Sequence, residues 1–244
     1  MKILHLDIET SPNVVRTWGL FKQNISINQI IKPARILCWS AKWHGEKKMY
    51  TSLGDKQGLT QIYDLINEAD VVVHYNGQRF DMPRLNQEFL KLGFKPPKPY
   101  KQIDLYRVVS KHFDLPSSKL EFVVQYFGLG AKVKHPGMEL WNGCEEGNEA
   151  SWALMFKYNK QDVALLEKLY NHLLGWIDNH PNAGLYVEDL DHPICPNCAG
   201  AKLQRRGFCR KDALRYQQFQ CQTCGRWPRS RKAEKGNKNV LGRA

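Results

Sequence analysis

The sequence predicts a mixed α/β domain, with a sheet flanked by helices, followed by a small metal-binding β-ribbon. Two observations lead to this fold class. In the first 178 residues, short apolar β-prone segments alternate with segments of helical periodicity, which is typical of a mixed sheet covered by helices. In the last 50 residues, two C-x-x-C pairs enclose an aromatic and basic stretch, and such pairs fold around one ion.

The first predicted strand, residues 2–8 in KILHLDIETSP, contains one carboxylate, Asp7, and a second one, Glu9, follows it directly. Its Ile and Leu residues are typical of a strand that is covered on both faces. Asp7 and Glu9 are two positions apart, so their side chains point to the same side of the strand. Because two carboxylates this close repel each other at neutral pH, we expect a cation between them.

The elements that follow are predicted from periodicity and turn residues. Residues 13–33 form a long irregular loop without an assigned role. Residues 34–53 form a hairpin that turns at His44 and Gly45. The later elements are a helix over 56–69, a buried strand over 70–76, a helix over 81–93 and a long helical run over 150–177. This order of elements predicts the mixed sheet flanked by helices.

Composition narrows the classes of protein. The chain has 244 residues, of which 42% are hydrophobic and seven are Trp, so disorder of the whole chain is excluded. Its apolar runs fall far short of the roughly 20 residues that a membrane helix needs, and no apolar N-terminal segment indicates secretion. We therefore expect a cytoplasmic protein without a membrane partner.

Four cysteines define the second module. Cys195 and Cys198 form one C-x-x-C pair, Cys221 and Cys224 form the other, and 22 residues lie between the pairs. Thiolates at this spacing converge on one tetrahedral ion, so we expect one structural Zn²⁺. A redox role for the pairs is the alternative, although nothing around them is typical of a thioredoxin unit. The other cysteines are expected to be buried or incidental thiols: Cys38, Cys144 and Cys209.

Positive charge is concentrated in the same module. Residues 201–244 carry 13 Lys and Arg against two acidic residues, and therefore +11 of the formal net charge of +12. A basic module beside a nearly neutral domain indicates binding to nucleic-acid phosphates, with a solubilising tail as the alternative. The residues expected to contact phosphate without reading bases are Arg205, Arg206, Arg210, Lys211, Arg215, Arg226 and Arg229.

The stretch CPNCAGAKLQRRGFCRKDALRYQQFQCQTCGRWPRSR resembles the zinc ribbons of transposase-associated proteins, in its two knuckles, its basic hairpin and its F-x-C strand. Tyr216 and Phe219 are expected to pack the small core of the ribbon rather than to stack on bases. The predicted ribbon spans residues 194–230. A linker over residues 179–193 precedes it, and a basic disordered tail over residues 231–244 follows it.

Four carboxylates from separate segments form a candidate site for two metal ions. Asp7 and Glu9 lie on the first strand. Asp81 lies where a loop meets a helix, and Asp162 lies on the long helical run. Two ions about 3.5–4 Å apart stabilise both the attacking and the leaving oxygen of a phosphoryl displacement. Because all four side chains offer oxygen, we expect two Mg²⁺ or Mn²⁺ ions.

The motifs LDIET, HYNGQRFD and YNKQD resemble, in this order, the three motifs of the DEDD superfamily of 3′→5′ exonucleases on the ribonuclease H-like fold. The Y-x-x-x-D spacing marks the DEDDy subclass, and the resemblance is nearest to phage and polymerase-proofreading domains. It implies an exonuclease domain over residues 1–178. It also implies the following roles: ion binding by Asp7, Glu9, Asp81 and Asp162, orientation of the attacking water by Tyr158, and contacts to the 3′ nucleotide by Asn76 and Phe80.

We therefore predict a metal-dependent 3′→5′ exonuclease that releases nucleoside 5′-monophosphates from nucleic acid, with DNA favoured over RNA. The alternatives are a structure-selective endonuclease of the same fold and a non-catalytic nucleic-acid-binding adaptor. Replication or recombination proteins are candidate partners. The pairing of the two modules also fits a phage or mobile element, which would place the protein in the host cytoplasm.

Several single residues keep two interpretations. Tyr158 is also compatible with a core tyrosine on an amphipathic helix, and Asp104 with a helix N-cap. The lysines between the second and third motifs either contact the nucleic-acid backbone or are simply solvated: Lys119, Lys132 and Lys134.

Overall fold

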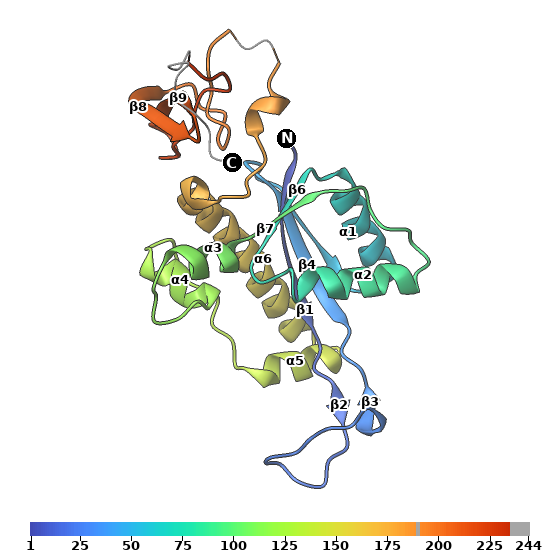
Figure 1. The fold of residues 1–244 in the computed structure, drawn as a ribbon. Coiled ribbons are helices and arrows are strands. Elements are labelled where there is room, and N and C mark those ends of the chain that lie inside the picture. Colours follow the sequence, from blue (N-terminus) through green and yellow to red (C-terminus); the bar gives the residue numbers. More distant parts are fainter. Residues whose placement is uncertain (189–190, 235–244) are drawn as a thin grey trace. The chain divides into compact units, whose positions relative to one another are not determined.

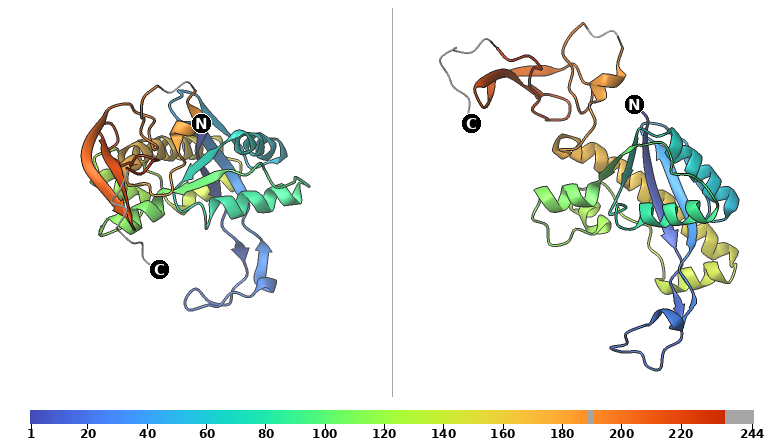
Figure 2. Two further views of the ribbon diagram at one scale, coloured as in Figure 1. Left: turned by 45° about the horizontal axis from the view of Figure 1, so that its top comes forward. Right: turned by 45° about the vertical axis from the view of Figure 1, so that its right-hand side comes forward.

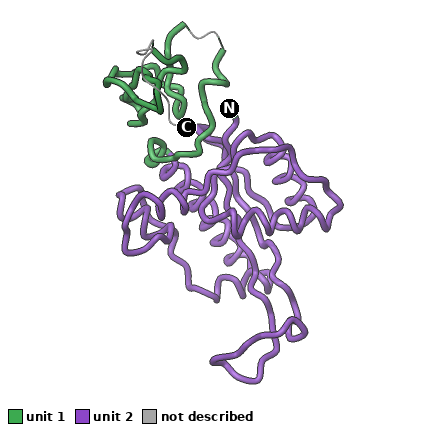
Figure 3. The backbone as a smooth tube through the Cα atoms, in the orientation of Figure 1, with its two compact units in different colours: residues 1, 171–244 green, residues 2–170 purple. Residues whose placement is uncertain are grey.

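The structure is a computed structural model that describes residues 1–188 and 191–234. It contains two compact units, residues 2–170 and residues 171–244 together with Met1 (Figure 3). Residues 235–244, which make up most of the predicted basic tail, lie outside the described residues.

The larger unit is built on a five-stranded mixed sheet with the order β5-β4-β1-β6-β7 (Figure 1). The central strand β1 pairs antiparallel with β4 and parallel with β6. The predicted hairpin is confirmed, because β4 and β5 pair antiparallel around a turn in which Gly45 has a φ of +79°. The strand bounds are β1 Ile3–Thr10, β4 Ile36–Trp43, β5 Met49–Leu53, β6 Val71–His74 and β7 Lys101–Asp104.

Helices cover both faces of this sheet (Figure 1, Figure 2). On one face, the core joins β1 to α1 and α2, and on the other face buried side chains join β4 to α5 and α6. The predicted mixed sheet flanked by helices is therefore confirmed. The helix bounds are α1 Lys56–Glu68, α2 Asp81–Lys91, α3 Leu105–His112, α4 Leu120–Tyr126, α5 Met138–Glu145 and α6 Glu149–Leu173.

The two faces of β1 carry different side chains. Leu4, Leu6 and Ile8 belong to the apolar cluster that includes α1 and α2. The alternate residues His5 and Asp7 contact α6, through the Tyr170 ring and the Asn159 amide respectively. Because successive side chains of a strand point to opposite faces, a single segment supplies both a core and a polar surface.

The loop predicted over residues 13–33 contains a small two-stranded arm. Strands β2, Val14–Val15, and β3, Ile30–Lys32, pair antiparallel, and the chain between them projects from the sheet (Figure 1). The apolar side chains most exposed on this arm are Trp18, Leu20, Phe21 and Ile27. Within the described residues, these four side chains stay exposed.

The smaller unit is organised around the hairpin of β8, Leu203–Lys211, and β9, Leu214–Cys221. Its register shifts between Arg205 and Phe208, where Gly207 has a φ of +72°. The smaller unit begins at Asn171, near the end of α6, and the Asn197 amide donates to the carbonyl of Leu174, directly after that helix, over 3.1 Å. Tyr216 and Phe219 are half-buried in the hairpin, as expected for a ribbon with a very small core.

Within the described residues, no helix combines the length and the apolar character needed to cross a membrane.

Candidate active site

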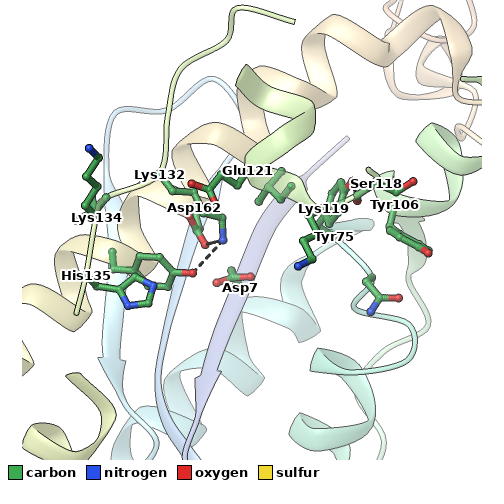
Figure 4. Close-up of a pocket in the computed structure, with 14 residues that line it drawn as sticks. Asp7, Tyr75, Tyr106, Ser118, Lys119, Glu121, Lys132, Lys134, His135 and Asp162 are labelled. Carbon is green, nitrogen blue, oxygen red and sulfur yellow. Dashed lines mark hydrogen bonds and ion pairs between the residues drawn. The ribbon is translucent and has the colours of Figure 1, made fainter. Parts of the chain in front are cut away.

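Three of the four predicted carboxylates converge between β1 and α6. One oxygen from each of Asp7, Glu9 and Asp162 lies within 4.8 Å of the others. Asp7 and Glu9 come from the same face of β1, and α6 places Asp162 against that face. Residues 155 positions apart in the sequence thus meet because the long helix crosses the central strand, as Figure 4 shows for Asp7 and Asp162.

The fourth carboxylate, Asp81, is placed next to this group rather than inside it. It lies at the start of α2, and its Oδ1 accepts a hydrogen bond of 3.1 Å from the backbone N–H of Ile8. Its side chain is buried, with 3% exposed, and its charge raises the pKa of Asp7. Asp81 therefore ties α2 to β1 while it adds negative charge to the site.

The four carboxylates are difficult to ionise together. Burial raises the pKa of Glu9 to about 8, with a further contribution from the charge of Asp162. Burial likewise raises the pKa of Asp81 to about 7. The pKa of Asp7 is held well above its usual range by burial and then by the charges of Asp81, Glu9 and Asp162. A cation bound among these groups would remove this cost, because it favours the ionised carboxylates.

The donor set fits hard divalent cations. All the converging atoms are carboxylate oxygens, the ligands preferred by Mg²⁺ and Mn²⁺. Burial raises the pKa of Asp162, and its Oδ1 is buried without a hydrogen-bond partner. Since a buried oxygen without a partner is costly, this atom is available to an ion.

Asn159 is a site residue that the sequence analysis missed. Its side chain is completely buried on α6, and its Nδ2 donates to Oδ2 of Asp7 over 2.7 Å. The amide fixes one oxygen of Asp7 and leaves the other free to face the site. The signal was present in the sequence, since Asn159 directly follows Tyr158 in the third motif.

Lys132 is the second residue whose role the sequence did not reveal. Its Nζ donates to Oδ2 of Asp162 over 2.5 Å and to Oη of Tyr158 over 3.0 Å (Figure 4). Burial lowers the pKa of Lys132, but the charge of Asp162 and these hydrogen bonds outweigh burial and raise the pKa above its usual value. Of the two interpretations of this lysine, the structure excludes a simply solvated side chain.

Tyr158 presents its hydroxyl to the site rather than to the apolar core alone. Its ring packs edge-on against His135 and Trp141, with ring centres 4.9 Å and 6.3 Å away. Burial and the charge of Asp162 raise the pKa of the phenol to about 12. The hydroxyl is therefore protonated at neutral pH and is suited to position a water or an oxygen by hydrogen bonding.

An open cleft of about 840 Å³ extends from the carboxylates to the loop after β6 (Figure 4). Asn76 lines this cleft and has a φ of +61°, while its backbone N–H donates to Asp104 over 2.8 Å. Asp104 also caps α3, since its side chain accepts from the N–H of Tyr106, so the predicted N-cap is confirmed. Phe80, 41% exposed, precedes α2 and is not part of the cleft lining.

Gly77 makes the turn of the second motif possible. A Cβ on this residue would lie 2.5 Å from Cγ of His74, closer than atoms approach without a clash. The close approach lets the N–H of Gly77 donate to Nδ1 of His74 over 3.1 Å. The imidazole of His74 therefore holds the loop that carries Asn76, while its Nε2 lies 3.0 Å from Oε1 of Gln102.

The four cysteines of the smaller unit form a compact cluster. Their sulfur atoms lie within 4.8 Å of one another. The distances from Cys195 to Cys224 and from Cys198 to Cys221 are 3.6 and 3.5 Å between Sγ atoms. Tetrahedral Zn²⁺ with Zn–S bonds of about 2.3 Å requires sulfur atoms about 3.8 Å apart, so the cluster is compatible with zinc. Cys209 lies outside this cluster, opposite Tyr216 on the hairpin.

Of the seven basic residues predicted to contact phosphate, six are exposed on the ribbon: Arg205, Arg206, Arg210, Lys211, Arg215 and Arg229. Three of the ribbon arginines have partners within the described residues. Arg215 forms an ion pair of 3.0 Å with Glu234 and lies over the ring of Phe208, and Arg229 lies over the ring of Tyr216. Arg226 differs from the others, because its guanidinium binds the carbonyl of Gly175 and the carboxylate of Asp178.

The chain belongs to the RNase H superfamily, whose sequence model matches residues 4–174. In structure, 71% of the chain is similar to part of the family B DNA polymerase from the hyperthermophilic archaeon Pyrobaculum calidifontis, with a TM-score of 0.55 and 20% sequence identity. The matched region is 24% of that polymerase. Because the sequence identity is only 20%, this likeness shows the fold alone. No curated protein shows significant similarity to the chain. The superfamily and its fold support a nuclease.

Proposed function

We propose that the protein is a two-metal-dependent 3′→5′ exonuclease that hydrolyses the terminal phosphodiester of nucleic acid, with DNA as the preferred substrate. The observation that carries the proposal is the group of Asp7, Glu9 and Asp162 at one end of an open cleft, with the Tyr158 hydroxyl beside it. A strand end fits such a cleft, and the third motif supplies a tyrosine where an exonuclease needs an oriented water.

The motif residues in and around the cleft have proposed tasks. Asp7, Glu9 and Asp162 hold divalent ions, with Asp81 adding charge from the start of α2. When bound, the ions supply an activated water and stabilise the charge on the phosphate. Tyr158 orients the attacking water through its protonated hydroxyl. Asn76 and Phe80, on the loop before α2, contact the 3′-terminal nucleotide.

The ribbon is proposed to hold one structural Zn²⁺ and to tether the enzyme to its substrate. This part of the proposal is supported by the sulfur geometry and by the five exposed basic residues of the hairpin. Contacts to phosphate add affinity without sequence preference and weaken as salt increases. Tethering raises the local concentration of strand ends at the cleft.

Digestion of end-labelled strands tests the proposal. Single-stranded DNA and RNA, labelled at the 3′ or the 5′ end, are incubated with Mg²⁺ or Mn²⁺ and with the wild type or the Asp7→Asn variant. We expect immediate release of labelled mononucleotide from the 3′ end and its loss in Asp7→Asn. The matched control is Asp64→Asn, which changes an exposed carboxylate of α1 far from the converging oxygens in sequence and on another element.

Other products would identify the alternatives. Internal cuts that yield oligonucleotides would indicate a structure-selective endonuclease, whose active site uses a similar pair of metal ions. Salt-sensitive binding without cleavage in any metal would leave a nucleic-acid adaptor. The rates of digestion of the DNA and RNA substrates show which nucleic acid is preferred.

A further inference from the structure

A second group of metal-ligating side chains lies in the larger unit, outside the cleft. His5 comes from β1, His44 from the turn after β4, and Glu167 from α6. One ligand atom of each lies within 4.8 Å of the others. None of the three residues lines the cleft, and neither the two-metal site nor the ribbon gives them a task.

The distances suit a single small cation. Nε2 of His5 lies 3.2 Å from Nδ1 of His44, and Nδ1 of His44 lies 3.5 Å from Oε1 of Glu167. Tetrahedral Zn²⁺ with bonds of about 2.0–2.2 Å to nitrogen and oxygen requires ligand atoms about 3.3–3.5 Å apart. Two of the three separations therefore match the edges of one coordination sphere, and the third is within 4.8 Å.

Protons alone do not satisfy these three atoms. If Nε2 of His5 carries the proton, it donates to the one lone pair of Nδ1 of His44, and this unprotonated nitrogen then lies 3.5 Å from the negatively charged Glu167 carboxylate. If Nδ1 of His44 carries the proton, that one hydrogen must serve both His5 and Glu167. A cation at the centre would use all three lone pairs at once.

The surroundings hold the three side chains in place. The ring of Tyr170 packs edge-on against both imidazoles, with ring centres 5.3 Å from His5 and 5.1 Å from His44. The carboxylate of Glu167 is oriented by the backbone N–H of Gly45, which donates to Oε1 over 2.8 Å, and by Lys42, which pairs with Oε2. Such outer contacts fix the orientation of metal ligands.

We propose that His5, His44 and Glu167 bind a single Zn²⁺-class transition-metal ion that fastens the β4–β5 turn and α6 to the central strand. Two imidazole nitrogens and one carboxylate oxygen favour such an ion over the Mg²⁺ or Mn²⁺ of the all-oxygen site. The ion is structural with respect to the proposed reaction. It stabilises β1 at His5, two residues before Asp7.

Zinc stoichiometry of the full-length chain tests this site. The purified protein is loaded with Zn²⁺ in a buffer with excess Mg²⁺, which occupies the all-oxygen carboxylates, and bound zinc is measured after gel filtration. We expect His44→Ala to bind one equivalent less than the wild type. The matched control is His112→Ala, which removes a histidine of α3 outside the cluster and is expected to keep the full zinc content.

A conservative variant and a second measurement distinguish loss of the metal site from misfolding. Glu167→Gln keeps the size of the side chain and an oxygen for Gly45, and we expect it to weaken zinc binding at this site by about tenfold or more. Co²⁺ substitution distinguishes the two sites, because the cysteine cluster gives thiolate charge-transfer bands and the proposed site gives d–d bands without them. Equal zinc content in the wild type and both variants, with unchanged Co²⁺ spectra, would overturn the proposal. Loss of zinc in His112→Ala would do the same.

Discussion

The two faces of the eight-residue strand β1 differ in polarity: one is apolar, and the other carries histidine and carboxylate side chains. The face formed by Leu4, Leu6 and Ile8 is dry, apolar and closed by α1 and α2. The opposite face presents His5 and Asp7 to α6, where burial makes charges costly. The apolar face thus stabilises the fold, whereas on the other face buried carboxylates repel one another, and a bound cation would reduce this repulsion. Along this single strand, the residues that stabilise the fold therefore differ from those proposed to support activity.

Substitution of Asp7 by Asn should give the largest effect, a loss of activity without a loss of metal-free stability. The change removes one ion ligand, and the several kcal/mol that a bound ion contributes to the transition state correspond to a rate loss of about a thousandfold. Since Asn still accepts the hydrogen bond from Asn159 and carries no buried charge, we expect the metal-free melting temperature to stay the same or to rise. Nuclease assays and thermal melts in EDTA measure both quantities. A fall in metal-free stability would contradict the separation of the two faces.

Substitution of the neighbouring Leu6 by Ala should give the reverse result. Leu6 is fully buried in the cluster shared with α1 and α2, so we expect unfolding to become easier by about 2–5 kcal/mol. The rate per folded molecule should change little, because the side chain points away from the carboxylates. Urea denaturation and initial rates below the melting temperature provide the two readouts. The exposed Leu90 of α2, changed to Ala, is the control and should cost about 0.5 kcal/mol or less. A large loss of turnover in folded Leu6→Ala would show that the faces are coupled.

The sequence predicted the elements that depend on periodicity and missed contacts that depend on chain path. The apolar, β-prone residues of β1 and the apolar faces of the helices predict the sheet and its covering helices without reference to distant residues. The carboxylates were predicted from short motifs. Lys132 was not, since it reaches Asp162 across 30 residues, from a segment between α4 and α5 that has no periodicity. No local pattern encodes where such a segment passes.

The same limit applies to the histidine cluster. His5 and His44 are 39 residues apart, and Glu167 approaches them only because α6 runs along the same face of β1 as the carboxylates. The sequence showed that the odd positions of β1 share one side, but not which helix covers it. The structure shows that α6 covers this side of β1 and completes both candidate metal sites of the larger unit.

The polar face of β1 should also give the chain a characteristic pH dependence in the absence of metal. The pKa of Glu9 is raised to about 8 in the folded state, against about 4.5 in an unfolded chain. The neutral carboxyl therefore favours folding fully below pH 4.5, and this contribution is lost as the pH rises through 8. We expect Glu9→Gln to gain stability relative to the wild type between these values when thermal melts in EDTA are compared. With saturating Mg²⁺ the difference should shrink or reverse, because the wild type then gains the bound ion. Parallel pH curves for the two proteins in EDTA would contradict this assignment of Glu9.

The smallest expected effect concerns the ammonium group that already neutralises part of this face. Lys132 pairs with Asp162 and so occupies an oxygen that a divalent ion would use. Substitution by Met removes this competing cation and should tighten Mn²⁺ binding about fivefold, the equivalent of about 1 kcal/mol for one partly buried pair. Electron paramagnetic resonance of free Mn²⁺ during a titration measures the affinity directly. Lys134→Met, two residues away on the exposed side of the same segment, is the matched control and should bind as the wild type does. Weaker Mn²⁺ binding in Lys132→Met would mean that the lysine supports the ion site instead of competing with it, and that the polar face needs both cations at once.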